Sequence, residues 1–326
     1  MRTYLLRRLA SYIIIFLIAI SLNFILPRLM PGDPMQLIAG NAVRQLGPER
    51  LSKLRSDYGL DKPLGEQYLH YLKMLASGDL GYSYRYSGGK SVSQVLGEHF
   101  IWTVFLVTTS LALAIAVGTS LGVWAAWQNS YSRDLGLLVG LFTLRSIPSF
   151  WLALILIPIF SVKLGWFPSG DSYSIPRLAG WENVQDVLHH AALPIVVLTL
   201  AYIPTAFAIA RASMLNVVGE DYIRTAFSKG LSDKRVVFRH ALRSAALPIL
   251  TVFALDFGQL LGGVTLIEVV FNYRGIGNMM FEAVKSRDYP LLQGGFLLFT
   301  LVVLTINFLL DWIYPRLDHR VTENHP

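Results

Sequence analysis

The chain has 326 residues, of which 53% are hydrophobic and only 15% charged, with a formal net charge of +7 and no cysteine. Soluble domains carry about 25% charged residues. This composition therefore excludes a disordered chain, a disulfide scaffold and an ordinary soluble enzyme, and it indicates a membrane protein. Without cysteine, thiol catalysis and cysteine-based zinc sites are also excluded.

Six stretches of the sequence are long and apolar enough to cross a bilayer, which takes about 20 helical residues. They are roughly Leu9–Met30, Phe100–Trp127, Leu135–Ser161, Ala191–Ser213, Ala245–Val270 and Leu291–Tyr314. The first run is longer than the core of a signal peptide and no cleavage motif follows it, so we expect it to be retained. The sequence predicts an all-α, polytopic protein with six transmembrane helices.

The orientation follows from the basic residues beside the spans, because lysine and arginine collect on the cytoplasmic side. If both termini are cytoplasmic, thirteen basic residues lie inside and five lie in the short outside loops. The inside set is Arg2, Arg7, Arg8, Arg133, Arg211, Arg224, Lys229, Lys234, Arg235, Arg239, Arg243, Arg316 and Arg320; the outside set is Lys163, Arg177, Arg274, Lys285 and Arg287. The excess positive charge then faces anionic lipid, and we expect no nucleic-acid binding.

The longest stretch outside the spans is the external loop of residues 31–99. Apolar positions at helical spacing predict an amphipathic helix near Glu66–Ala76, followed by the turn Ser77-Gly78-Asp79. The predicted division of the chain is residues 1–30 (N-terminal end and first span), 31–99 (folded external loop), 100–314 (five-helix core with the cytoplasmic loop 214–244) and 315–326 (cytoplasmic tail).

Motifs of catalysis and metal binding are missing from the sequence. The stretch Gly89-Lys90-Ser91 lacks the first glycine of a phosphate-binding loop, since Tyr84 stands there. His189 and His190 are adjacent and so point to different faces of a helix, unlike a metal-binding pair four residues apart. The sequence therefore predicts a protein that is not an enzyme and that binds no metal or cofactor itself.

The cytoplasmic loop predicts a short helix from Glu220 to Gly230. Glu220 and Asp221 suit the positive N-terminal end of a helix, and Gly230 suits a left-handed C-terminal cap. Its apolar face is predicted to carry Tyr222, Ile223, Ala226 and Phe227, opposite Arg224, Thr225, Ser228 and Lys229. The pattern leaves two interpretations open, a helix packed on its own bundle or one docked into a soluble partner. A second helix is expected to start near Ser232.

Ionisable residues inside the spans are costly and usually pair or line a cavity. Arg145 and Asp256 are expected at a similar depth in spans three and five, with Gln259 one turn beyond Asp256. They either line a translocation path or form a structural ion pair. Glu268 and Asp311 lie near span ends, where we expect water to reach them.

Five stretches in order resemble the permease family of bacterial ABC importers, specifically its dipeptide/oligopeptide/nickel branch. They are Leu29–Pro34, Gly59–Leu64, Gly78–Ser83, the loop Thr225–Leu231 continuing through His240–Ser244 to Leu247-Pro248, and the last external loop with Phe271–Gly277 and Arg287–Pro290. The loop resembles the branch's form of the "EAA" motif, although Arg224 and Thr225 stand where the broader consensus has Glu and Ala.

The resemblance implies a type I ABC importer permease with partners. These are a second homologous permease, two ABC ATPase subunits that use ATP and Mg, and an extracytoplasmic substrate-binding protein. It implies a coupling role toward the ATPase for Glu220, Asp221, Tyr222, Ile223, Arg224, Thr225, Ala226, Phe227, Lys229 and Gly230. It also implies contact with the binding protein near Tyr273, Arg274, Arg287 and Asp288.

The implied location is the bacterial inner membrane, and the implied cargo is short peptides, with nickel chelates or oligosaccharides as alternatives within the branch. Two other classes remain open on the residues alone. One is a secondary transporter driven by an ion gradient, with Arg145 and Asp256 as its coupling site. The other is a membrane receptor or scaffold whose cytoplasmic helix recruits a partner.

Overall fold

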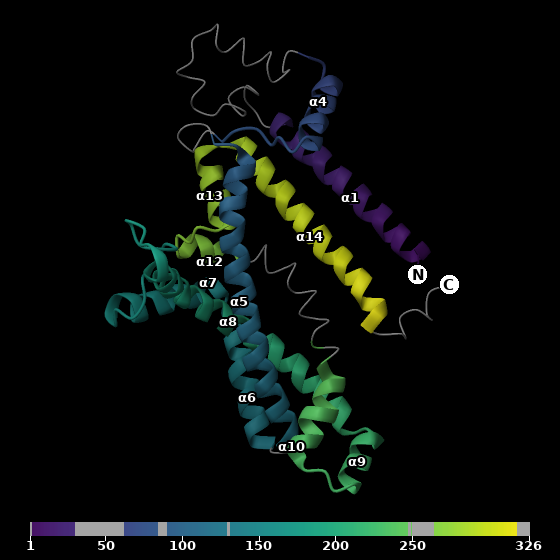
Figure 1. Cartoon of the computed structure of the whole chain (residues 1–326). Coiled ribbons are helices and arrows are strands. Elements are labelled where there is room, and N and C mark those ends of the chain that lie inside the picture. The colour runs from purple at the N-terminus through teal and green to yellow at the C-terminus, as the bar shows by residue number, and fades with distance from the viewer. Residues whose placement is uncertain are drawn as a thin grey trace. The chain divides into compact units, whose positions relative to one another are not determined.

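The computed structural model describes residues 2–29, 62–83, 90–128, 131–246, 249 and 264–317, and in these ranges the fold is all-helical apart from one isolated β-bridge between Tyr82 and Ser91. The elements are α1 (Arg2–Leu29), α4 (Leu64–Ala76), α5 (Val92–Trp127), α6 (Tyr131–Arg145), α7 (Ser149–Leu156), the π-helix η2 (Ile157–Lys163), α8 (Gly180–Val218), α9 (Asp221–Ser228), α10 (Asp233–Arg235), the π-helix η3 (Val236–Ala241), α12 (Thr265–Val270), α13 (Ile276–Ser286) and α14 (Tyr289–Leu317) (Figure 1).

The chain forms two compact units. Unit 1 comprises Met1–Thr103 and Arg274–Asp311, and unit 2 comprises Val104–Tyr273 and Trp312–Pro326. Helix α5 runs through the boundary between them.

Four described helices are long and apolar enough to span a membrane, or five if the bent pair of α6 with α7 and η2 counts as one span. The third span expected at Leu135–Ser161 is not one straight helix, because the chain bends by 90° between Arg145 and Ser149. Pro148 accounts for the break, since it lacks an N–H and disfavours helix at the residue before it. Most of the expected fifth span, Ala245–Val270, lies outside the described residues.

In unit 1, polar contacts near both ends join α1 and α14, which run side by side in Figure 1. At one end Asn23 Nδ2 donates to the Gln293 carbonyl at 2.9 Å, and Gln293 Nε2 donates back to the Asn23 carbonyl at 2.8 Å. At the other end the Tyr12 hydroxyl donates to Asp311 at 2.5 Å, and Arg8 lies 3.5 Å from the same oxygen. The Asp311 carboxylate of α14 therefore binds α1, and its side chain remains 19% exposed.

The rest of unit 1 packs around the start of α5. Its buried core is formed by Val92, Val95, Leu96, Ile276, Met279, Ala283 and Leu291, from α5, α13 and α14. The predicted external helix is confirmed as α4, and the turn after it contains Gly78 at φ 75°. Tyr68 and Tyr71 of α4 place their rings 5.1 and 5.5 Å from that of Phe24 in α1.

In unit 2, α5 and α8 approach each other at two glycines one turn apart. A Cβ on Gly118 would lie 2.4 Å from the Ala206 Cβ, and one on Gly122 would lie 2.7 Å from the Phe207 carbonyl oxygen. Small residues at this spacing allow helix backbones to pack closely within a bilayer. Arg211 of α8 also forms a two-pronged ion pair with Asp134 of α6, so α8 is fixed to both neighbours.

Candidate functional site

Helix α9 confirms the short helix predicted in the cytoplasmic loop. It follows Glu220, which is extended, and Asp221 supplies negative charge in the first turn. At its other end the Gly230 N–H donates to the Phe227 carbonyl at 2.9 Å and the Leu231 N–H to the Ala226 carbonyl at 3.4 Å. Gly230 has φ 73°, so this is a Schellman cap with glycine at its left-handed position.

The predicted apolar face of α9 is divided between the protein's interior and its surface. Ile223 and Ala226 are 1% and 5% exposed, and α9 packs on η3. Tyr222 and Phe227 are each 43% exposed. The helix is thus held by its own chain, as the first interpretation expected, while Tyr222 and the polar side chains Arg224, Thr225 and Lys229 remain on the surface.

A ring contact joins α9 to a second element of unit 2. Phe227 stacks on Trp127, the last residue of α5, with ring centroids 6.0 Å apart and planes 27° apart. Offset aromatic pairs of this kind are worth about 0.5–1.5 kcal/mol beyond their buried area. Helix α9 therefore rests on both η3 and the end of α5.

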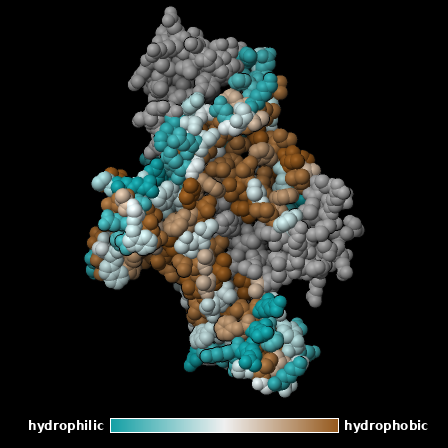
Figure 2. Space-filling model, viewed as in Figure 1, coloured by the Kyte–Doolittle hydropathy of each residue, from teal (hydrophilic) through white to brown (hydrophobic). Residues whose placement is uncertain are grey.

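The chain after α9 is helical but less regular than predicted. Ser232 precedes α10 as expected, and Val236, Val237 and Ala241 are buried. Residues Val236–Ala241, however, form the π-helix η3, and Phe238 is exposed. In Figure 2 the end of unit 2 that carries α9 and α10 is largely hydrophilic. The sequence-predicted coupling residues therefore lie together on one polar end of the unit.

The structure describes only one of the three residues that the sequence suggested for a translocation path. Arg145 is the last residue of α6, is exposed, and directly precedes the 90° bend. It is at a helix break rather than within a continuous span. Asp256 and Gln259 lie outside the described residues, so the expected proximity of these side chains to Arg145 stays a prediction.

The four residues expected at the external partner surface differ sharply in exposure. Tyr273 and Asp288 are buried in the chain itself, so neither offers a surface to a partner. Burial raises the pKa of the Tyr273 phenol far above its usual range, and the charge of Glu268 adds to the shift. Glu268 is itself fully buried, contrary to the water-exposed position expected from the sequence.

The Asp288 carboxylate forms hydrogen bonds at the start of α14. Its Oδ2 accepts a hydrogen bond from Ser83 Oγ at 2.5 Å, and its Oδ1 accepts one from the Leu291 N–H at 3.2 Å, in the first turn of α14. This is an N-cap, which satisfies a backbone donor that the helix leaves free. Its neighbour Arg287 is exposed and has a left-handed backbone with φ 56°.

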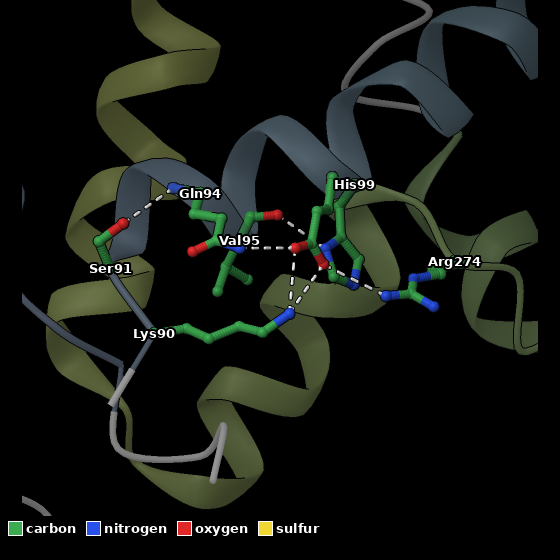
Figure 3. Close-up of polar contacts among 7 residues, drawn as sticks. Lys90, Ser91, Gln94, Val95, His99 and Arg274 are labelled. Carbon is green, nitrogen blue, oxygen red and sulfur yellow. Dashed lines mark hydrogen bonds and ion pairs between the residues drawn. The ribbon is translucent and has the colours of Figure 1, made fainter. Parts of the chain in front are cut away.

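Arg274 belongs to a charged cluster that the sequence did not indicate. Glu98 of α5 accepts from Lys90 Nζ at 3.0 Å and from an Arg274 amino group at 3.3 Å (Figure 3). His99 beside it is buried, with its Nδ1 2.8 Å from the Val95 carbonyl oxygen. Glu98 and Arg274 are 176 residues apart in sequence, so no local pattern joins them. Each of the three charged side chains is about one-third exposed.

Among the described residues, no group of three or more His, Asp or Glu side chains is arranged to hold a metal ion.

Two family models cover nearly the whole chain. Residues 118–323 match the "Binding-protein-dependent transport system inner membrane component" family, and residues 1–109 match the N-terminal domain of the same type of membrane component.

Curated relatives match over their full length. The chain is 36% identical over 319 residues to a glutathione transport system permease protein, GsiC, of Pectobacterium atrosepticum, covering 98% of both chains. It is 38% identical over 344 residues to a di/tripeptide transport system permease protein, DppB, of Pseudomonas aeruginosa, covering 98% of this chain and 100% of the relative. A probable peptide ABC transporter permease of Sinorhizobium fredii is 37% identical, covering 98% of this chain and 99% of the relative.

Solved structures of the MetNI methionine ABC transporter in inward-facing conformations share the fold. Two crystal forms give TM-scores of 0.52 and 0.54 at 18% and 17% identity, covering 69% of this chain and 97% of the matched chain. At this level of identity the likeness concerns the fold alone.

Proposed function

The chain belongs to the family of binding-protein-dependent transport system inner membrane components, and from this premise we propose that it forms half of the pore of an ATP-driven importer of short peptides. It is a multi-pass inner-membrane permease subunit and not a catalytic one. Relatives named for glutathione and di/tripeptide transport support peptide cargo, while nickel chelates and oligosaccharides remain the alternatives.

The proposed assembly contains a second homologous permease, two ATPase subunits that bind ATP and Mg, and an external substrate-binding protein. We place both termini on the cytoplasmic side, as the thirteen basic residues favour. Another component shifts the balance between a pore subunit's two states only if it binds those states differently. Closure of an ATPase pair on ATP supplies that difference, and the family's dependence on a partner argues against an ion-gradient mechanism.

The coupling proposal rests on one observation, that α9 packs against two other elements, η3 and the end of α5. Ile223 and Ala226 fix the helix to η3, and Phe227 fixes it to the end of α5. Tyr222 and Arg224 stay on the surface, where a groove of the ATPase contacts them. A helix of two turns is marginal alone, so these supports make it stiff enough to transmit a displacement.

Two further roles complete the proposal. Arg145 lines the translocation path together with Asp256 and Gln259; if Arg145 and Asp256 pair, neutralising Asp256 alone impairs uptake more than neutralising both. Arg274 and Arg287 contact the binding protein on the external side, whereas burial removes Tyr273 and Asp288 from that role.

A photo-crosslinking experiment tests the coupling role in the full chain within cells. We expect p-benzoyl-phenylalanine in place of Tyr222 to crosslink to the ATPase subunit, with a yield that depends on ATP. The same probe in place of Tyr82, which is 55% exposed and on the proposed external side, serves as the matched control. An ATPase crosslink from position 82, or none from 222 in an assembled transporter, contradicts the proposal.

A further inference from the structure

The first three turns of α8 expose their apolar face, whereas a helix in a soluble protein buries it. The apolar side chains Trp181, Val184 and Leu188 lie on one stripe, at spacings of three and four residues. They are 69%, 41% and 51% exposed. A helix in water buries its apolar stripe against the protein, so the surroundings of this stripe cannot be bulk water alone.

Part of the polar face of the same turns, around Asn183, Asp186 and His190, is only partly exposed and lies against the preceding loop, residues 164–179. Asp186 accepts from the Ser174 N–H at 2.7 Å and from the Ser174 hydroxyl at 2.6 Å. Arg177 Nε donates to Asn183 Oδ1 at 3.1 Å. His189 Nε2 lies 2.8 Å from the Trp166 carbonyl oxygen. These contacts fix the rotation of the helix, with its polar side toward the loop and its apolar stripe outward.

The length of α8 shows why its first turns need their own explanation. Its 39 residues, which include the interior prolines Pro194 and Pro204, amount to about 58 Å of helix measured along its axis, whereas the hydrocarbon core of a bilayer is about 30 Å thick. The apolar span expected at Ala191–Ser213 accounts for that thickness. Residues Gly180–His190 therefore extend past the core at the end opposite α9, toward the layer of lipid head groups.

Neighbouring side chains continue the same kind of surface. Trp166 is 59% exposed, and its ring lies 5.6 Å from that of Phe160 in η2. Along α7 and η2, Trp151, Leu154, Ile155, Ile159 and Val162 are also exposed. Tryptophan is enriched where a membrane meets water, because its ring is apolar and its N–H polar. Lys163 and Arg177, exposed in the same segment, suit a layer of lipid phosphates.

We propose that residues Gly180–His190 of α8 bind the lipid head-group layer through Trp181, Val184 and Leu188, with the 164–179 loop holding the helix at that rotation. Under the orientation proposed above this is the outer leaflet. The contact with lipid itself does not depend on that orientation, on the cargo or on the energy source.

Quenching of single-site fluorophores tests the contact in the assembled transporter. Because the chain has no cysteine, Val184→Cys and Leu188→Cys each offer one site for a bimane label. Glu182→Cys is the matched control, since Glu182 is exposed on the same turns outside the apolar stripe. Each labelled transporter is placed in nanodiscs with plain or brominated lipid, and iodide serves as the aqueous quencher.

We expect brominated lipid to quench the labels at 184 and 188 several-fold more than the label at 182, and iodide to give the opposite order. Iodide quenching at 184 and 188 equal to that at 182 overturns the proposal, because the stripe then faces water. Labels at 184 and 188 that neither quencher reaches also overturn it, because a protein partner then covers the stripe. A failure of ATP-driven uptake would refute the proposed function and leave this result standing.

Discussion

Phe227 of α9 stacks on Trp127 at the end of α5, and this contact gives the short helix α9 a second support beyond its packing on η3. The two residues come from elements separated by 100 positions in sequence. A helix fixed at only one point would pivot when a partner moved it. With two supports, the proposed displacement of α9 would act on both the end of α5 and η3.

Removing the ring of Phe227 should weaken coupling without removing the partner-facing side chains. We expect Phe227→Ala to lower uptake several-fold per ATP hydrolysed, since a stack worth about 0.5–1.5 kcal/mol is lost. Phe227→Tyr keeps the ring and should behave as wild type. The measurement is the ratio of uptake to ATP hydrolysis in proteoliposomes; an unchanged ratio in Phe227→Ala would show that the stack transmits nothing.

The cap of α9 can be tested with two glycines that flank the helix. Gly230 has φ 73° and nothing within 4 Å of an added Cβ, so Gly230→Ala should cost about 1–2 kcal/mol through the backbone alone. Gly219 has an ordinary φ of −75°, and Gly219→Ala is the control. Amide hydrogen exchange across Asp221–Ser228 should become faster only in Gly230→Ala. Equal protection in both variants would exclude strain at the cap.

The close approach of α5 and α8 predicts that Gly→Ala substitutions in the spanning helices differ in their effect on stability. Gly118→Ala or Gly122→Ala forces backbone or Cβ atoms apart, because the new methyl would lie under 3.0 Å from α8. Gly140→Ala in α6 meets nothing within 4 Å and provides the comparison. We expect the first two variants to lower the melting temperature in detergent and the third to leave it unchanged or raise it. Three equal melting temperatures would be evidence against the observed contact.

Arg287 and Asp288 are neighbours, and we expect substitution of the first to change affinity for the binding protein and substitution of the second to change stability. Arg287→Gly suits the left-handed backbone and should preserve stability while weakening affinity for the binding protein. Asp288→Ala removes the cap of α14 and should cost about 1 kcal/mol of stability. Thermal melting and binding-protein affinity measured on both variants separate the two roles. Wild-type affinity in Arg287→Gly would remove Arg287 from the proposed contact.

Local features of the sequence predicted α9 well. Asp221 in its first turn and Gly230 at its cap are signals carried within one short segment, and the structure confirms both. The sequence could not show which apolar residues of α9 pack inside this chain and which stay exposed, since Ile223 and Phe227 lie on the same face of a helical projection. Their different burial depends on η3 and on Trp127, which only tertiary structure brings to the helix.

The long-range placement of charged residues and the size of the bend in the third span could not be predicted from local sequence patterns. The run from Leu135 to Ser161 is apolar enough for one span, yet Pro148 and its two predecessors interrupt it with a 90° bend. The burial of Glu268 and the cluster of Glu98 with Lys90 and Arg274 depend on helices distant in sequence. Hydropathy places such residues near span ends but does not report what packs around them.

The central claim is that this subunit moves solute only when a partner ATPase drives it, and reconstitution tests that claim most directly. Liposomes are prepared with this chain alone, and with the second permease and the ATPases added, and peptide accumulation is followed with binding protein outside and ATP inside. We predict accumulation against a gradient only in the complete assembly, and none when a non-hydrolysable nucleotide replaces ATP. Uphill accumulation by this chain alone would contradict the account.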